Sequence, residues 1–492
     1  MKETSVFAVA TIREIENKWI AAKTVTANEL MHRAGAAALV ALNQYFAAAK
    51  KIMIIAGGGN NGGDGYVLAT LLHKKAIDVS VFYVGELNDL PAAAADAYKA
   101  CEHAGVSIQP FSSDISFAEV DLIVDAICGI GLQTPLRKEL ITVLEKIEKS
   151  QLPVLAIDIP TGVHADTGCV LGKAIQATVT ITFIGLKLGL LTGKGIGLAG
   201  KVILANLDIP PELLEAMPPS AFIINENITQ ETLPKRSRDW HKGLSGHVLI
   251  VGGDVGMSGA CQLAAMAALR VGAGLVSVAM HPKCAKRISG FMPEVMCHGI
   301  DDMAKLQSLL AKATVIVIGP GLGQSDWSHE IWQEIMKQPH PKVVDADGLN
   351  WLAKNPIKHD NWLLTPHPLE AARLLNQEKA NTIVEDRPGS VMRLQKQYGG
   401  VAILKGAGSL VAAENELLRV CIRGNPGMST AGMGDVLSGV LGGLLAQGAT
   451  LFAAAKLGVY IHAVAGDLAT LNGGERGMIA SDVMPYLHQL VN

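Results

Sequence analysis

The sequence predicts an α/β protein with two domains, each a three-layer α/β/α structure. Three observations point to this class. Short apolar runs alternate with stretches of helical periodicity, which is the pattern of βαβ units and a mostly parallel sheet. Glycine is abundant, with 52 residues, and many glycines follow directly after the apolar runs. The 492 residues suffice for two to four domains of about 150 residues, and two large domains fit the pattern best.

The composition excludes several classes of protein. Hydrophobic residues make up 49% of the chain and charged residues 18%, which supplies folded cores and is too little charge for a disordered chain. The formal charge is -3 and the densest basic patch, residues 235–238, is short, so we expect no nucleic-acid partner. Seven scattered cysteines without a C-x-x-C pattern predict free, mostly buried thiols in a cytoplasmic protein.

One segment tests whether the chain meets a membrane. Residues 436–455 carry no charge and have about the length of a membrane span. Their four glycines and the break at residues 447–450 favour two buried helices instead. The first residues also lack the pattern of a signal peptide, so we expect no membrane association.

The first half begins with helical periodicity over residues 11–42 and continues as alternating strands and helices. The predicted strands are residues 52–56, 79–84, 121–126, 154–159, 179–183 and 202–207, and residues 66–75 form a predicted helix. Proline pairs at residues 210–211 and 218–219 then interrupt the order, because a central strand or helix does not hold them. We place the domain boundary there, giving domains of residues 1–217 and 218–492.

The second half restarts the same alternation. Its predicted strands are residues 247–251, 315–318, 342–345, 362–365 and 401–404. The two halves share glycine-rich loops but no common period. The chain is therefore expected to be a fusion of two different α/β domains and not a repeat.

The loop over residues 57–65 follows the first strand and contains a G-x-G-x-x-G pattern. Glu86 follows the next strand, where a ribose-binding acid would lie, so a Rossmann oxidoreductase is one interpretation. Against it, Asp64 would open the next helix, where a carboxylate repels a pyrophosphate. Without a ligand, Asp64 would cap the helix while Asn60 and Asn61 take turn conformations.

Two more strands of the first half end in an acidic residue. Asp125 is followed by Gly129-x-Gly131, and Asp158 is followed by Pro160-Thr161-Gly162. Each acid alone is typical of a loop cap. Because the carboxyl ends of parallel strands line the ligand crevice, three such strand ends together predict a site.

In the second half, small residues over 424–434 lead into an apolar helix with Asp435 in its first turn. Backbone N–H groups at such a helix start bind anions, and a carboxylate there can accept a hydroxyl proton during phosphoryl transfer. An Asp that only caps the helix is the alternative. Residues 405–409 offer backbone donors and a lysine for a nucleotide, and residues 319–323 and 365–370 follow two further strands. No Walker A motif occurs.

Residues 60–65, 124–131 and 157–162 resemble the signature blocks of the NAD(P)H-hydrate epimerase domain, as do residues 30–35 and 187–189. The resemblance spans nearly all of residues 10–210. It implies a Rossmann-like fold and an epimerase that interconverts the R and S forms of NADHX and NADPHX. NADHX and NADPHX are the damaged, 6-hydroxylated forms of the reduced cofactors NADH and NADPH.

The resemblance also implies roles for individual residues of the first half. The implied substrate contacts are Asn60, Asn61, Gly62, Gly63, Asp64, Gly129, Ile130, Gly131, Leu132, Gln133, Thr134, Pro135 and Asp158. Asn61, Asp125 and Thr161 would hold a potassium ion, and their oxygen atoms suit a hard cation. Asp158 is the expected acid–base group, because inverting C6 requires a species open to attack from either face.

The second half resembles the ribokinase-like superfamily, and within it the NAD(P)H-hydrate dehydratase domain, over about residues 225–490. The matching blocks are residues 241–243, 252–253, 258–260, 270–275, 319–323, 345–350, 365–368 and 405–406. The resemblance implies that ADP or ATP phosphorylates the S-hydrate and that phosphate loss restores NADH or NADPH. ADP, which yields AMP and phosphate, is the expected donor because the chain resembles bacterial fusions that use ADP.

Site residues of the second half follow from the same resemblance. Ala260, Gly323, His367 and Asp435 would contact the hydrate, with Asp435 as the base. Lys405, Gly406, Ala407, Gly408, Ser409 and Gly434 would contact the nucleotide, and Glu370 is the acid associated with Mg²⁺. Two departures are Leu369, where the family has Gly, and Met433, where it has Ser or Ala.

Three alternatives remain open at this point. A small-molecule kinase would use the same second half and release the phosphorylated product. A Rossmann oxidoreductase would use the first half for hydride transfer. A non-enzymatic first domain would bind nucleotides or a partner without exchanging epimers. We also expect a homo-oligomer, as is common among soluble enzymes.

Overall fold

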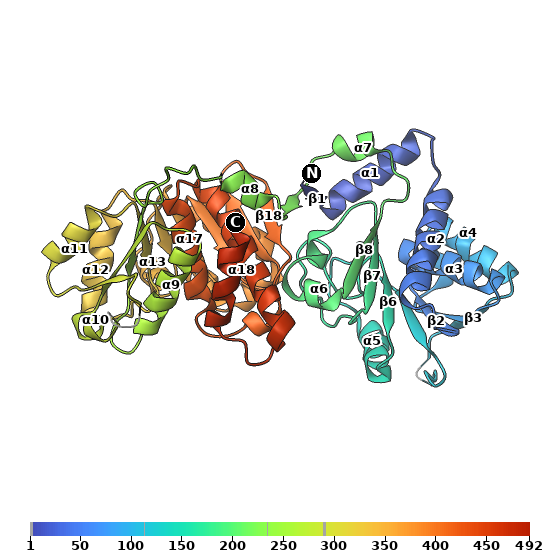
Figure 1. Cartoon of the computed structure of the whole chain (residues 1–492). Helices are drawn as coiled ribbons and strands as arrows, with labels where there is room; N and C mark the ends of the chain where they lie inside the picture. The colour runs from blue at the N-terminus through green and yellow to red at the C-terminus, as the bar shows by residue number, and fades with distance from the viewer. Residues whose placement is uncertain (1–2, 113, 234, 289–291) are drawn as a thin grey trace. The chain divides into compact units, whose positions relative to one another are not determined.

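The chain divides into two compact units in the computed structural model, which describes residues 3–112, 114–233, 235–288 and 292–492. One unit is Ser5–Ala221, and the other is Phe222–Asn492 joined by the start of the chain (Figure 1). The predicted boundary after residue 217 lies shortly before this division.

The first unit is built on a seven-stranded sheet. Its order is β4 (Ser107–Pro110), β3 (Asp78–Tyr83), β2 (Lys51–Ala56), β5 (Leu122–Ala126), β6 (Val154–Ile157), β7 (Val179–Phe183) and β8 (Lys201–Ala205). All neighbouring strands are parallel. The chain winds outward in opposite directions from β2 and β5, so a crevice opens at their carboxyl ends.

Helices cover both faces of this sheet because its strands are apolar on both sides. Ile52 and Ile54 of β2 belong to the core under α2 (Ala27–Tyr45), α3 (Asn60–Lys74) and α4 (Ala92–His103). Met53 and Ile55 of the same strand belong to a second core with Leu144 of α5 (Lys138–Ser150). This alternation produces the predicted three layers.

The structure corrects two helices predicted in this unit. Residues 11–42 are not one helical stretch but α1 (Val9–Ala21) and α2, and Thr26 begins α2 by accepting a hydrogen bond from the backbone N–H of Glu29 at 3.1 Å. The helix predicted over residues 66–75 begins at Asn60 instead, because the glycine-rich loop itself forms its first turns. The six predicted strands are confirmed within a few residues, and β4 was not predicted.

An eleven-stranded sheet forms the centre of the second unit. Its order is β1 (Thr4–Val6), β9 (Ala221–Ile223), β18 (Leu418–Cys421), β17 (Ser409–Ala413), β16 (Val401–Leu404), β15 (Trp362–Leu364), β14 (Lys342–Val344), β13 (Val315–Ile318), β10 (His247–Val251), β11 (Leu275–Met280) and β12 (Met296–Gly299). Strands from β12 to β16 pair in parallel, whereas β17 and β18 are antiparallel. The five predicted strands are confirmed, and β1, β9, β11, β12 and the β17–β18 hairpin were not predicted.

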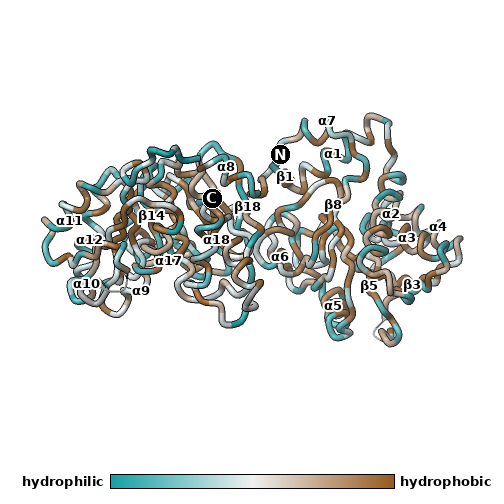
Figure 2. The backbone as a smooth tube through the Cα atoms, viewed as in Figure 1, coloured by the Kyte–Doolittle hydropathy of each residue, from teal (hydrophilic) through white to brown (hydrophobic). Residues whose placement is uncertain are grey.

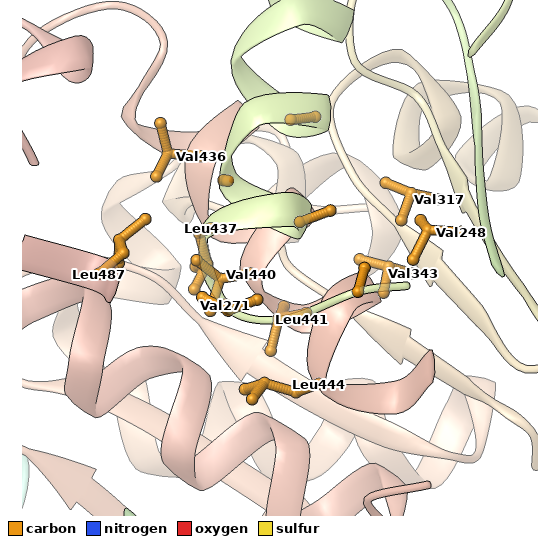
Figure 3. Packing of buried hydrophobic residues seen from close by; sticks show 14 of the residues in the cluster. Val248, Val271, Val317, Val343, Val436, Leu437, Val440, Leu441, Leu444 and Leu487 are labelled. Atoms are coloured by element: carbon orange, nitrogen blue, oxygen red, sulfur yellow. The ribbon is translucent and has the colours of Figure 1, made fainter. Parts of the chain in front are cut away.

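The core of the second unit lies between this sheet and α17 (Met433–Ala446). Val440, Leu441 and Leu444 of α17 project toward the sheet residues Val248 and Val317 (Figure 3). Figure 2 shows the same division in both units, with apolar strands inside and hydrophilic segments toward the surface. The close fit of apolar side chains fixes the position of α17, whose first turn belongs to the site described below.

The uncharged segment forms two helices, as predicted. α17 ends at Ala446 and α18 (Leu451–Gly473) begins after the break. Among the described residues, only α18 is long and apolar enough to span a membrane, and 61% of the window concerned is buried inside the protein. All seven cysteines are free and five of them are buried, which confirms the prediction of free, mostly buried thiols.

The remaining helices lie between the strands along the chain or after the last of them. In the first unit these are α6 (Gly193–Leu198) and α7 (Pro211–Glu215). In the second unit they are α8 (Ile228–Thr232), α9 (Ser258–Arg270), α10 (Pro282–Ile288), α11 (Met303–Leu310), α12 (Asp326–Met336), α13 (Asp347–Lys354), α14 (Pro368–Leu374), α15 (Asn381–Glu385), α16 (Arg387–Tyr398) and α19 (Met484–Leu490).

Candidate active sites

A pocket of about 460 Å³ opens at the carboxyl ends of β2, β5 and β6. Of the expected substrate contacts, Asn60, Asn61, Asp64, Gly129, Ile130, Gly131, Leu132 and Asp158 line it. Gly62, Gly63, Gln133, Thr134 and Pro135 lie outside its lining among the described residues. Gly62 and Gly63 pack inside the first turns of α3, and the Gln133 side chain lies 3.1 Å from a ring nitrogen of His164. The strand ends therefore meet in one pocket.

Asp158 is the most constrained polar residue of this pocket. Its Oδ1 accepts hydrogen bonds from Lys187 Nζ at 2.8 Å and from Thr182 Oγ1 at 3.2 Å, while its Oδ2 accepts one from Ile130 N at 3.0 Å. Its φ of 65° is left-handed, a strained conformation that is typical of functional positions. The surrounding donors hold the carboxylate in one orientation.

Lys187 completes the Asp158 pair and was not among the expected site residues. Its ammonium group donates to Asp158, to Thr182 Oγ1 and to Phe183 O, each at 2.8 Å, and its side chain is 1% exposed. A buried ammonium ion is tolerated because three acceptors satisfy its three protons. The sequence feature that could have identified Lys187 is its place in residues 187–189, one of the blocks that resemble the epimerase domain.

Gly129 allows the Asn61 amide and the Asp158 carboxylate to approach each other. A Cβ at Gly129 would lie 2.8 Å from Asp158 Oδ2 and 3.2 Å from Asn61 Oδ1. Among the described residues, neither polar atom of the buried Asn61 amide has a hydrogen-bond partner. A native buried amide without partners calls for an explanation, and a bound ligand or ion is one.

Asp125 and Thr161 form a buried pair beside this wall of the pocket. Thr161 Oγ1 donates to Asp125 Oδ1 at 2.7 Å, and Thr161 N donates to Asp125 Oδ2 at 2.8 Å. Burial raises the pKa of Asp125 to about 6, although its hydrogen bonds oppose the shift. A cation would offset the same cost, so the carboxylate, hydroxyl and amide oxygens present fit the expected potassium ion.

Asp64 does not cap a helix, so that alternative is wrong. α3 begins at Asn60 with Gly59 as its N-cap, which places Asp64 inside the helix. Burial, with the nearby charges of Asp158 and Glu16, raises the pKa of Asp64 well above its usual range. This shift favours the protonated form of Asp64, which can donate a hydrogen bond to a ligand in the pocket.

The second site surrounds the start of α17. Gly432 precedes the helix with a φ of 92°, and Asp435 lies in its first turn without making a side-chain cap. The capping alternative for Asp435 is therefore wrong. Burial and the charge of Asp345 raise the pKa of Asp435 to about 7, against the effect of Lys405. A carboxyl group with this pKa is suited to accepting a proton near neutral pH.

Asp345 joins the strand ends around Asp435 and was not predicted as a site residue. Its Oδ1 lies 2.7 Å from Lys405 Nζ and accepts a hydrogen bond from Thr365 Oγ1 at 2.7 Å. Its Oδ2 accepts one from Ser438 Oγ of α17, also at 2.7 Å. The buried carboxylate thus ties β14, β15 and the lysine after β16 to the helix that carries Asp435. A Cβ at Gly434 would lie 3.4 Å from Lys405 Nζ, so this glycine leaves room at the lysine.

His367 and Glu370 form a reciprocal cap at the start of α14. His367 Nδ1 accepts hydrogen bonds from Leu369 N and Glu370 N, and Glu370 Oε2 accepts one from His367 N at 2.8 Å. Burial raises the pKa of Glu370 to about 7, although Lys405 lies only 3.8 Å from its carboxylate. Among the described residues, no cluster of three His, Cys, Asp or Glu side chains forms a metal site. Glu370 therefore fits Mg²⁺ only together with other ligands.

Ala260 and Gly323, two expected hydrate contacts, lie at the carboxyl ends of β10 and β13. Gly323 N donates to Asp347 Oδ2 at 2.9 Å, and a Cβ at Gly323 would meet Asp254 Oδ2 at 2.8 Å. Ala260 lies on the same side, because a Cβ at neighbouring Gly321 would meet its side chain at 3.2 Å. The direction of winding changes between β10 and β13, which is where open α/β sheets bind ligands.

Comparison with known proteins gives consistent results for both halves. The family described as YjeF-related protein N-terminus matches residues 27–189, and the NAD(P)H-hydrate dehydratase family matches residues 248–489. Among solved structures, the ADP/ATP-dependent NAD(P)H-hydrate dehydratase from Bacillus subtilis, co-crystallised with ATP/Mg²⁺, matches with a TM-score of 0.50 and 26% identity. The match covers 55% of this chain and 96% of that chain.

Full-length relatives extend the likeness across both units. The bifunctional NAD(P)H-hydrate repair enzyme Nnr of Coxiella burnetii is 43% identical over 481 residues, covering 98% of each chain. The enzyme of the same name from Escherichia coli is 40% identical over 469 residues, covering 95% of this chain and 90% of that protein. The chain belongs to the family of bifunctional NAD(P)H-hydrate repair enzymes.

Proposed function

We propose that residues 1–217 epimerise the R and S forms of NADHX and NADPHX, and that residues 218–492 dehydrate the S form with ADP. The observation that carries the proposal is that two separate carboxyl groups, Asp158 after β6 and Asp435 in the first turn of α17, each lie in a candidate site. The first faces a pocket with an unpartnered amide, and the second lies at an anion-binding helix start. An epimerase that equilibrates both hydrates and a dehydratase that consumes one of them together empty the whole pool.

In the dehydratase half, Asp435 takes the proton of the hydrate hydroxyl as its oxygen attacks the terminal phosphorus of ADP. AMP leaves. The C6–O bond of the phosphate ester then breaks and phosphate departs with the electron pair, while C5 gives up a proton to solvent, so that the C5–C6 double bond of the reduced nicotinamide ring is restored. The backbone N–H groups at the start of α17 receive the transferring phosphoryl group. Lys405 offsets the negative charge of the phosphoryl group, and the ion pair with Asp345 holds the Lys405 ammonium group in place.

Residues 405–409 and Gly434 are proposed to hold the nucleotide, and Ala260, Gly323 and His367 the hydrate. ADP is the proposed donor and ATP the alternative, since the Bacillus subtilis relative is named for both nucleotides. Mg²⁺ would accompany the phosphates and offset their charge. Glu370 is the proposed protein ligand of Mg²⁺, with phosphate and water oxygens completing the ligand set.

In the epimerase half, Asn61, Asp125 and Thr161 are the proposed potassium ligands, and Asp158 is the proposed acid–base group. The ion would supply fixed positive charge beside the cofactor. The substrate contacts are proposed to be Asn60 to Asp64, Gly129 to Pro135 and Asp158. A cytoplasmic location and a homo-oligomer also belong to the proposal.

The test supplies the purified protein with the S-hydrate alone and then with an R/S mixture, adding ADP or ATP with Mg²⁺ and K⁺. Recovery of NADH absorbance with ADP from the S form supports dehydration, and full recovery from the mixture supports epimerisation. Release of a stable phosphorylated product without NADH would instead favour a small-molecule kinase. Hydride transfer from ordinary NADH would favour an oxidoreductase.

A further inference from the structure

One helix, α1, contributes three residues to the lining of the epimerase pocket. Ile12, Arg13 and Glu16 of α1 line the pocket together with the loops that follow β2, β5 and β6. Ile12 and Ile15 of α1 are buried in the core, so the helix turns its Arg13–Glu16 flank toward the loops. The first turn is fixed by a hydrogen bond from Val9 N to Asp166 Oδ1 at 2.9 Å. A polar side chain in this part of the lining therefore has a defined place.

Glu16 has the environment of a functional carboxyl group. Its side chain is partly accessible from the pocket and makes no hydrogen bond or ion pair within the part of the chain that the structure describes. The charged groups around it are Asp158, Lys187, Arg13 and Asp64. A carboxyl group without a structural partner, in a pocket wall, is what proton transfer requires.

The environments of Glu16 and Asp158 differ in a way that separates their roles. The Asp158 carboxylate accepts hydrogen bonds from the Lys187 ammonium at 2.8 Å and from two further donors, so both of its oxygens have partners within the protein, whereas Glu16 has none among the described residues. Burial, and then the charge of Asp158, raises the pKa of Glu16, against the weaker effects of Lys187 and Arg13. Two carboxyl groups whose environments diverge in this way divide into an acid and a base.

We infer that Glu16 is a second acid–base group of the epimerase and acts on the opposite face of the hydrate from Asp158. This inference rests on the proposed function of the first unit. In one direction the Glu16 carboxylic acid protonates the C6 hydroxyl. The C6–O bond then breaks, and the oxygen keeps the electron pair and leaves as water. The N1 lone pair forms the N1–C6 double bond of an iminium ion.

A second water then adds to C6 from the other face. Its oxygen forms the new C–O bond, the N1–C6 double bond returns its electron pair to N1, and Asp158 accepts the released proton. Proton exchange through solvent in the open pocket restores both carboxyl groups, so the hydrate changes only in configuration. The reverse direction exchanges the two roles.

The test compares Glu16→Gln with Glu16→Asp and with Glu14→Gln. Glu14 lies on the same helix but is exposed and pairs with Lys18 at 2.7 Å, so its substitution is a matched control. The steady-state epimerisation of purified R-NADHX is followed in the full chain, while ADP-dependent dehydration of S-NADHX reports that the same molecules are folded. Substrate binding is read from KM.

We expect Glu16→Gln to lower kcat for epimerisation by about 100-fold or more, with KM changed by less than about threefold. Glu16→Asp should recover part of the rate, and Glu14→Gln should equal the wild type. Dehydration of S-NADHX should be unchanged in all three. The limb of the wild-type pH profile in which the rate falls as Glu16 loses its proton should be absent from Glu16→Gln.

A Glu16→Gln rate within about threefold of the wild type would overturn the inference, as would a rise in KM with an unchanged kcat. Loss of the rate in Glu16→Asp and Glu16→Gln together with an equal loss of R-NADHX binding would also overturn it, because it would show a structural role. A wild-type protein that does not epimerise at all would instead contradict the proposed function of the unit. The two failures are therefore distinguishable.

Discussion

At the scale of single residues, the two proposed bases differ in how the protein surrounds them. Asp158 is held by Lys187 and two further donors, whereas the Asp435 side chain makes no hydrogen bond among the described residues. Asp435 depends on burial for its properties, and burial raises its pKa to about 7. A small change of pH therefore alters the charge of the second site.

The first prediction concerns the pH dependence of dehydration. Because Asp435 must be ionised to accept the hydroxyl proton, the rate at saturating ADP should rise as the pH increases through about 7. Asp435→Asn should lower the rate by about 100-fold or more and leave epimerisation unchanged. Rates of both half-reactions across the pH range check this. A pH-independent wild-type rate in a pre-steady-state measurement of the chemical step would contradict it.

The second prediction concerns the stability supplied by the Asp345–Lys405 pair. Burial alone would raise the pKa of Asp345, but Lys405 and the surrounding hydrogen bonds outweigh it, so the folded pKa is lowered. The pair therefore stabilises the fold above the ordinary carboxyl range, and this stability is lost as the pH falls through the lowered pKa. Lys405→Met leaves the buried Asp345 charge uncompensated, which should cost about 3–5 kcal/mol at neutral pH.

Denaturant unfolding of Lys405→Met checks this value, with Lys396→Met as a control at an exposed lysine. An equal effect of the two substitutions would contradict the role given to the pair. The same variant should raise KM for ADP, since Lys405 is proposed to face the phosphates. Isothermal titration with ADP separates this binding effect from the loss of stability.

Some of these residues were predictable from the sequence and others were not. Asn61 and Asp158 stand in compact motifs that follow strands, and Asp435 stands in a compact motif at a helix start, so their position in a site could be inferred from the chain alone. Glu16 could not be distinguished from Glu14, because both lie on an amphipathic helix far from any motif. Their difference depends on which flank of α1 faces the pocket, and tertiary packing decides that.

At the scale of elements, the loop after β5 owes its function to the space that Gly129 leaves. A side chain there would displace Asp158 or Asn61. The third prediction is that Gly129→Ala lowers epimerisation by about 100-fold, because displacing the reacting groups by about 1 Å has this effect. Gly58→Ala in the same pocket should retain activity, since its Cβ meets nothing within 4 Å. Equal rates in the two variants would contradict the prediction.

The crossing of α9 and α17 sets the position of the second site. A Cβ at Gly439 would lie 2.0 Å from the backbone oxygen of Ala264, and backbone atoms cannot move aside as a flexible side chain can. The fourth prediction is that Gly439→Ala destabilises the second unit by about 3 kcal/mol through overpacking. Gly259→Ala, which meets nothing within 4 Å, should change stability by less than about 1 kcal/mol. Thermal unfolding compares the two, and equal stability would contradict the close crossing.

Elements were predictable where hydrophobicity alone decides them. The buried strands β13 and β16 are continuous apolar runs, β2 and β5 are apolar apart from Lys51 and Asp125, and all four were predicted. β12 and β4 carry polar residues and lie at sheet edges, so their pairing depends on neighbours that a local pattern does not contain. The break between α1 and α2 was missed because apolar spacing continues across it, while the cap at Thr26 ends the continuity.

At the scale of the whole molecule, the chain combines two sites whose proposed reactions are sequential. Each unit has its own sheet, its own core and its own crevice at strand carboxyl ends. Substitutions in one site should therefore leave the other reaction intact. This independence makes each half an internal control for the other in every test above.

The most direct test of the account measures NADH recovery from an R/S mixture of NADHX with ADP, Mg²⁺ and K⁺, at a protein concentration high enough that catalysed recovery is much faster than spontaneous epimerisation. The wild type should convert the whole mixture, Asn61→Ala should stop once the S form is consumed, and Asp435→Ala should produce no NADH while still equilibrating the two hydrates. Complete recovery by Asn61→Ala at the wild-type rate, or NADH formation by Asp435→Ala, would contradict the assignment of the two sites.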